Sequence, residues 1–202
     1  MKNHINKNKW FMPYYKLTSL NIDKQQTIIK YTNINIKNIK DISFSKLKKF
    51  IKNLYILCKL HYISLENRKI RDKHPEKRHP IQPLRGEIYN ALITENIGSE
   101  ICDNHLVVII SNPHTNIFAE KINVLPIEGD GNKVSSYLVK LSNEDLEYGK
   151  LDKNPSRIII PEIITIDKAR LGLKIGLIKK EKMLEINKKI IKQLSLKVVD
   201  KQ

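Results

Sequence analysis

The first regular pattern along the chain is an amphipathic helix over residues 45–67. Its apolar positions recur three or four residues apart, which places them on one face of a helix, while lysines occupy the other faces. Ser45 is suited to cap the first turn. The pattern predicts a helix that packs on the rest of the chain, self-associates or binds a partner. The apolar positions are Leu47, Phe50, Ile51, Leu54, Leu57, Cys58, His61 and Leu65.

From residue 85 onward the pattern changes to short apolar runs typical of β-strands. The run that follows His105 is unbroken, which predicts a mostly buried strand. Another run carries Pro126 near its end, where a proline is tolerated. The predicted strands cover residues 86–94, 105–111, 121–127, 136–141 and 157–166.

Two helices are predicted among and after these strands. Residues 142–151 begin with a serine cap and acidic first-turn residues and reach a glycine, which indicates one short helix. Residues 180–198 show helical spacing of apolar positions, which predicts a terminal amphipathic helix. Because the connections are short, the order indicates an α+β fold built on a mainly antiparallel sheet or half-barrel.

Residues 68–84 show no apolar periodicity. They carry three prolines and many lysines and arginines, which predicts a linker or an extended arm. His74 and His79 each precede a proline, which favours extended backbone, and we interpret them as solvated rather than as metal ligands. The predicted organisation is a basic N-terminal extension over 1–67, a linker over 68–84 and a folded domain over 85–202.

The formal net charge of +16 is concentrated in the first part of the chain. Residues 1–84 hold 19 Lys and Arg against 5 Asp and Glu, whereas residues 85–202 hold 18 against 16. A basic segment beside a near-neutral domain favours a polyanionic partner such as nucleic acid. The alternative is compositional bias, since Lys, Asn and Ile are enriched along the whole chain.

The cysteines and the apolar runs indicate a cytoplasmic protein. Cys58 and Cys102 are far apart and form no C-x-x-C pair, so a disulfide framework or a cysteine zinc site is not expected. The N-terminal residues lack the apolar region of a signal peptide. No apolar run approaches the ~20 residues that span a bilayer, so no membrane association is expected.

Four short motifs in the second half resemble one family of bacterial toxins. They are 85-RGEIY-89, 98-GSE-100, 107-VVIISN-112 and 165-TIDKARLG-172, in the family's order and spacing. Residues 85 to about 194 therefore resemble the MazF/PemK toxins of type II toxin–antitoxin modules. Residues 1–84 have no counterpart in a typical member of this family.

The resemblance implies the fold and the activity. It implies a small SH3-like barrel or half-barrel with a C-terminal helix, here preceded by a basic helical extension, that works as a homodimer. It also implies a sequence-specific endoribonuclease that cuts single-stranded RNA with no metal or other cofactor. A cognate antitoxin protein is the implied protein partner.

The chain departs from the pattern of the family at both positions expected to do chemistry, and also at Ile164, where the family often has an Arg before Thr165. After the Gly-Ser-Glu loop the family usually carries Arg-Pro, where this chain has His105 and Leu106. The following strand usually ends on a Thr or Ser that helps hold the scissile phosphate, and that position is Glu128. An imidazole and a carboxylate can share acid and base work near neutral pH, so we predict Glu128 as the general base and His105 as the general acid.

A structural interpretation of the same pair stays open. A histidine at the start of a strand can simply satisfy a local carbonyl. Glu128 precedes Gly-Asp-Gly, a strong turn signal, and can be a solvated hairpin residue. A carboxylate also repels the phosphates of RNA.

Five further residues are candidates for binding RNA. Arg85, Lys121 and Arg157 are chosen by charge alone, since the phosphorane needs a cation or donor nearby. Glu100 lies in the loop that covers the RNA groove in the resembling family, and it can contact RNA or simply support the loop. Asn112 can donate to a base edge or cap a turn.

The sequence leaves three classes of function open. The first is the endoribonuclease toxin. The second is a catalytically silent relative that binds nucleic acid or protein through the same groove. The third is a toxin of the CcdB type that acts on gyrase; it is the least favoured, because the chain ends VVDKQ and lacks a C-terminal Trp-Gly-Ile motif.

Overall fold

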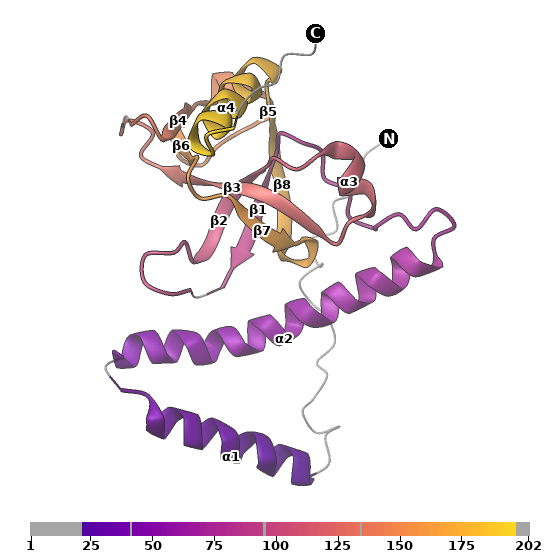
Figure 1. The fold of residues 1–202 in the computed structure, drawn as a ribbon, viewed down its shortest axis with the longest axis vertical. Helices are drawn as coiled ribbons and strands as arrows, with labels where there is room; N and C mark the ends of the chain where they lie inside the picture. Colours follow the sequence, from indigo (N-terminus) through magenta and orange to yellow (C-terminus); the bar gives the residue numbers. More distant parts are fainter. Residues whose placement is uncertain (1–21, 41, 95, 134, 197–202) are drawn as a thin grey trace. The chain divides into compact units, whose positions relative to one another are not determined.

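The computed structural model describes residues 22–40, 42–94, 96–133 and 135–196 (Figure 1). The chain divides into two compact units, Met1–Leu47 and Lys48–Gln202. The first contains helix α1, Ile22–Asn38, and the beginning of helix α2, Phe44–Lys73. None of the residues in α1 is buried. The second unit carries the rest of α2 and all the strands, and it holds the candidate site.

Helix α2 is longer than the sequence pattern indicates. It begins at Phe44, close to the predicted start, but it continues to Lys73, so residues 68–73 are helical where we predicted a linker. The reason is a set of side-chain contacts with one carboxylate. Arg68 makes two 2.8 Å hydrogen bonds to Glu120, and Arg71 donates to the same group at 2.7 Å. Arg68 and Arg71 are three residues apart and share one helix face, so both reach Glu120.

The segment after α2 is also partly buried, which corrects the prediction of a solvated arm. His79 is 1% exposed. Its backbone N–H donates to the carbonyl of Ile117 at 2.8 Å, and its Nδ1 accepts from the N–H of Ile81 at 3.0 Å. Burial, helped by the charge of Lys168, lowers the pKa of His79. The segment over residues 74–86 therefore packs on the folded domain, and we call it the strap.

Eight antiparallel strands form one curled sheet in the second unit (Figure 1). Their order is β4-β6-β3-β2-β1-β8-β5, and β7 pairs with a second part of β3. Helices α3, Pro113–Phe118, and α4, Lys180–Gln193, complete the unit. The strands are β1 Glu87–Ile93, β2 Asp103–Ile109, β3 Lys121–Gly129, β4 Leu138–Leu141, β5 Leu146–Gly149, β6 Ser156–Ile159, β7 Ile164–Asp167 and β8 Leu171–Ile178.

The predicted fold class is confirmed, with corrections to individual elements. The sheet is a curled antiparallel half-barrel with a C-terminal helix, preceded by helices. Residues 142–151 are not one helix: a 3-10 turn over Asn143–Asp145 leads directly into β5. The single strand predicted over 157–166 is interrupted by a turn and forms β6 and β7. Strand β8 and helix α3 were not predicted.

The two middle strands are buried on both faces. Alternate residues of β2 and β3 belong to two separate apolar clusters. Val108 and Leu125 contribute to a cluster that includes Met183 and Ile186 of α4. Val107, Ile109, Ile122 and Val124 contribute to the other cluster, which β7 and β8 help to cover. Burial on both faces explains why these segments read as continuous apolar runs.

A buried lysine lies where the strap, α3 and β7 meet. Lys168 is fully buried, and its Nζ donates to the backbone carbonyl of Asn116 at 2.5 Å. Burial lowers the pKa of Lys168 to about 8, while the charge of Asp167 opposes this shift. Asp167 also accepts from the hydroxyl of Ser64 on α2 at 2.7 Å and caps the following 3-10 turn.

No helix within the described ranges is long and apolar enough to cross a membrane.

The burial of Lys168 makes stability depend on pH in an alkaline window. The folded protein loses this proton near pH 8, whereas the unfolded chain keeps it up to about pH 10.5. The unfolded state binds more protons in that window, so this lysine makes the free energy of unfolding rise with pH. We expect the stability of the wild type relative to Lys168→Met to increase from pH 8 to 10.5 in urea titrations. A pH-independent difference would contradict this.

Candidate functional site

A row of polar side chains crosses the sheet near the ends of four strands. On β2 and β3, Leu106 lies opposite Ile127, so the same register places His105 beside Glu128 one step further. Glu128 lies opposite Arg157 on β6, and Arg157 lies opposite Lys140 on β4. We call these four side chains the polar row: His105, Glu128, Arg157 and Lys140.

All members of the polar row share one face of the sheet. Residues directly opposite in an antiparallel pair place their side chains on the same face, and alternate residues of a strand share a face. His105 therefore lies on the face of Val107 and Ile109, next to one of the two apolar clusters. His105 comes directly before the apolar run of β2, so the polar groups of the row lie beside the core and do not interrupt it.

Glu128 is held in place by Arg157. The Nη2 of Arg157 donates to Oε2 of Glu128 at 2.8 Å, and Nη1 lies 3.7 Å from a carboxylate oxygen of Asp130. The Arg157 side chain is only 15% exposed, and its Nε is buried without a hydrogen-bond partner. The guanidinium therefore fixes the Glu128 carboxylate on the row, but its own charge is largely committed to protein carboxylates.

A second carboxyl group lies within electrostatic reach of the row. Burial and the negative charge of Glu128 raise the pKa of Glu162, while His105 opposes that shift. A raised pKa means that Glu162 holds its proton more readily than a solvated glutamate does. His105, Glu128 and Glu162 thus lie near one another at the end of the row.

A pocket of about 380 Å³ lies at the same strand ends, and it includes atoms of His105 and Glu128. Strand alternation places their side chains on the face opposite to those of Leu106, Ile127 and Ser156, which also line it. The pocket is therefore lined by residues of both faces of the sheet. We take the polar row as the candidate site, because it brings an imidazole, a carboxylate and a guanidinium together on one face.

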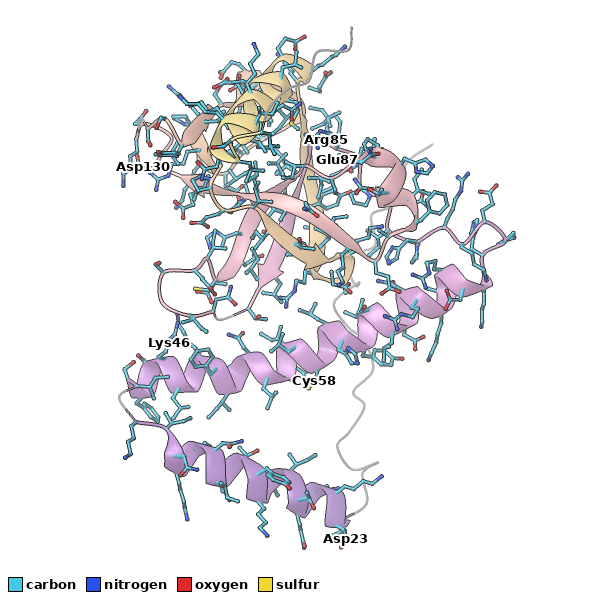
Figure 2. The ribbon with its side chains drawn as sticks, in the orientation of Figure 1. Asp23, Lys46, Cys58, Arg85, Glu87 and Asp130 are labelled. Atoms are coloured by element: carbon cyan, nitrogen blue, oxygen red, sulfur yellow. The ribbon has the colours of Figure 1, made fainter. Side chains whose placement is uncertain are left out.

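Three of the predicted site residues meet in the row, and four lie elsewhere. Lys121 is at the opposite end of β3 from Glu128, seven residues away, or about 23 Å of strand. Figure 2 shows Arg85 well separated from Asp130, the residue that follows β3. Arg85 donates to Asn187 of α4 at 2.5 Å, and burial lowers its pKa.

The other two predicted residues make local contacts. Asn112 caps α3, because its side chain accepts from the N–H of His114 at 2.8 Å, as the turn-capping alternative predicted. Glu100 is exposed in its loop and accepts from the N–H of Ile97 at 3.3 Å. Their roles toward RNA stay predictions.

Sequence reasoning did not find Lys140 or Glu162. Lys140 occupies the polar position of a strand with alternating polar and apolar residues. This pattern predicts that its side chain is exposed, but it does not predict which strand lies beside it. Glu162 follows Pro161 in the turn between β6 and β7. Across the described part of the chain, no three His, Cys, Asp or Glu side chains are grouped so that they could hold a metal ion.

The domain that carries the row matches a known family. Residues 84–194 match the family described as PemK-like, MazF-like toxin of type II toxin–antitoxin system. The chain belongs to this family. The match begins at residue 84, so helix α2 and most of the strap lie outside the part that defines PemK/MazF-like toxins.

Curated and solved proteins that are similar to this chain include the following three. The chain is 35% identical over 115 residues to the protein named Endoribonuclease MazF of Staphylococcus saprophyticus subsp. saprophyticus, covering 57% of this chain and 93% of that protein. MazF (Form-I) from Deinococcus radiodurans aligns with a TM-score of 0.48 at 15% identity, over 56% of this chain and 97% of that one. An endoribonuclease in complex with its cognate antitoxin from Mycobacterial species aligns with a TM-score of 0.45 at 20% identity, over 58% and 99%.

The Glu128–Arg157 ion pair of this PemK/MazF-like domain should stabilise it measurably. We expect Arg157→Met to lower the free energy of unfolding by about 1–3 kcal/mol, because it leaves a partly buried carboxylate without its charged partner. In a double-mutant cycle with Glu128→Gln, the coupling energy should be about 0.5 kcal/mol or more. The pair Glu66–Lys69 is the matched control: its glutamate is as exposed as Glu128, but its cation is 66% exposed against 15% for Arg157, so it should couple more weakly. Additive effects at Glu128 and Arg157 would contradict the clamp.

Proposed function

We propose that this chain is a sequence-specific, metal-independent endoribonuclease toxin that cleaves single-stranded RNA in the cytoplasm. We further propose that it acts as a homodimer and is neutralised by a cognate antitoxin. Membership of the PemK/MazF-like family supports the reaction class. The observation that carries the proposal is the register that places His105 beside Glu128 on one face of the sheet, with Arg157 bonded to that carboxylate.

The proposed chemistry uses these groups as acid and base. Glu128 takes the proton from a ribose 2′-hydroxyl, whose oxygen then attacks the adjacent phosphorus. The imidazolium of His105 gives its proton to the 5′-oxygen as the P–O bond to it breaks. The products are a 2′,3′-cyclic phosphate and a free 5′-hydroxyl, so the protons balance without a metal ion. Acid–base catalysis of this kind contributes typically 10²–10⁴-fold in rate.

Arg157 has a positioning role in this scheme. Its bond to Oε2 keeps the Glu128 carboxylate fixed on the row, and its positive charge stays close to the phosphorane. Burial and the negative charge of Glu128 raise the pKa of Glu162, so this carboxyl is more easily protonated than a solvated glutamate. The charge of Arg157 offsets part of the repulsion between RNA and the Glu128 carboxylate.

A silent binding module is the second candidate, and one observation favours it. Asp130 and Glu128 both engage Arg157, so no arginine of the row is left solely for phosphate. If the row does not catalyse, the same surface serves recognition of nucleic acid or protein. The two candidates differ in a single property, which is the appearance of cleaved RNA.

RNA cleavage in EDTA decides between them. We expect the purified wild-type chain to cut a long single-stranded RNA into discrete fragments. His105→Ala and Glu128→Gln should each lower the rate by about 10²-fold or more. The rate should depend on pH along a bell-shaped curve, because one group must be deprotonated and the other protonated. Fragment ends with a 2′,3′-cyclic phosphate would identify the 2′-hydroxyl as nucleophile.

Matched controls separate chemistry from folding. His114→Ala removes an imidazole that packs beside Phe118 of α3, and Glu147→Gln changes an exposed glutamate of β5. Both should retain the wild-type rate. Full activity in His105→Ala would exclude it as the acid. RNA binding without cleavage by any variant or by the wild type would assign the chain to the silent class.

A further inference from the structure

Building on the function proposed above, we propose that Lys140 forms a second phosphate subsite for single-stranded RNA, beside the scissile phosphate at His105 and Glu128. The placement of Lys140 comes from strand register. Lys140 lies directly opposite Arg157, which lies directly opposite Glu128, so all three side chains share one face. The strand neighbours Val139 and Leu141 are fully buried on the other face.

Lys140 is the member of the row whose charge is open to a ligand. It is exposed, and no carboxylate of the described ranges lies within ion-pair distance of its ammonium group. Arg157, by contrast, is bonded to Glu128 at 2.8 Å and lies 3.7 Å from Asp130. A phosphate that approached Arg157 would have to compete with both carboxylates, whereas Lys140 exchanges only water.

The charge around the row makes such a cation necessary for RNA. Glu128, Asp130 and Glu162 surround the proposed site of cleavage, and each repels phosphate when ionised. Phosphate contacts from lysines fix the register of a nucleic acid strand without reading its bases. Lys140 therefore attracts the strand and aligns it along the row.

The spacing suits a neighbouring phosphate of the same strand. Adjacent strands lie about 4.8 Å apart, so Lys140 is about 10 Å from Glu128, measured across two strand spacings. Arg157 stands on the strand between Lys140 and Glu128, and its guanidinium is already bonded to the Glu128 carboxylate, so it separates the ammonium group from the reacting atoms. The subsite thus holds a different phosphate, and the RNA backbone crosses the strands along the row.

Binding of a labelled single-stranded RNA tests the subsite. At ~0.1 M salt, Lys140→Met should weaken the Kd by about fivefold, because a single-strand phosphate contact releases about 0.7 counterion. Between ~50 and ~200 mM salt, the slope of log affinity against log salt should flatten by about 0.7. Lys140→Arg keeps the charge and should retain both values. Lys188→Met removes an exposed lysine of α4 and serves as the matched control.

Cleavage kinetics give an independent readout. If Lys140 binds a phosphate away from the reacting atoms, Lys140→Met should raise KM by a similar factor and leave kcat at saturating RNA unchanged. A fall in kcat with unchanged Kd would overturn the subsite, because the lysine would then act on the chemical step. Equal Kd values and salt slopes for Lys140→Met and Lys188→Met would overturn it as well.

The outcome separates the subsite from the catalytic proposal. If the wild type binds RNA but does not cleave it, endoribonuclease activity fails while the Kd and the salt slope still decide the role of Lys140. If His105→Ala abolishes cleavage and Lys140→Met binds like the wild type, the catalytic pair stands and the subsite fails. A wild type that neither binds nor cleaves RNA overturns both.

Discussion

Burial of β3 on both faces is the constraint on which the rest of the domain depends. Five of its nine positions between Lys121 and Gly129 are apolar, and all five are buried, so its middle cannot hold a charged side chain. Its partners β2, β6 and β7 supply the hydrogen bonds, while α4 and the neighbouring strands cover the two faces. Polar chemistry is thereby restricted to the end of the strand, where Glu128 lies.

The charges at that end are arranged to fix a carboxylate rather than to attract an anion. Arg157 satisfies Glu128 and approaches Asp130, and its partial burial strengthens these contacts relative to a solvated ion pair. A surface that acts on phosphodiesters has to offset this negative charge. The exposed ammonium group of Lys140 is one means that the structure offers.

The fold class followed from the sequence because the apolar runs are long and their order is simple. The resemblance singled out His105 and Glu128, and the register of β2 with β3 places them side by side, whereas their roles stay predictions. The length of α2 did not, because its last turn depends on contacts between Arg68, Arg71 and Glu120 that join segments far apart in the chain. The position of Lys140 required the pairing of β4 with β6, and no local pattern specifies the partner of a strand.

The folded domain begins before the family match, because the strap and α2 also pack on it. His79 of the strap and Leu60 of α2 are both buried. The side-chain amide of Asn116 donates a hydrogen bond to the carbonyl of Pro83 at 3.0 Å. A chain shortened to residues 84–202 would lose all of these contacts and leave Glu120 without its two arginines. The family match therefore marks a shorter stretch of polypeptide than the one that packs together in this structure. A boundary drawn from sequence similarity alone would cut through buried contacts of the folded unit.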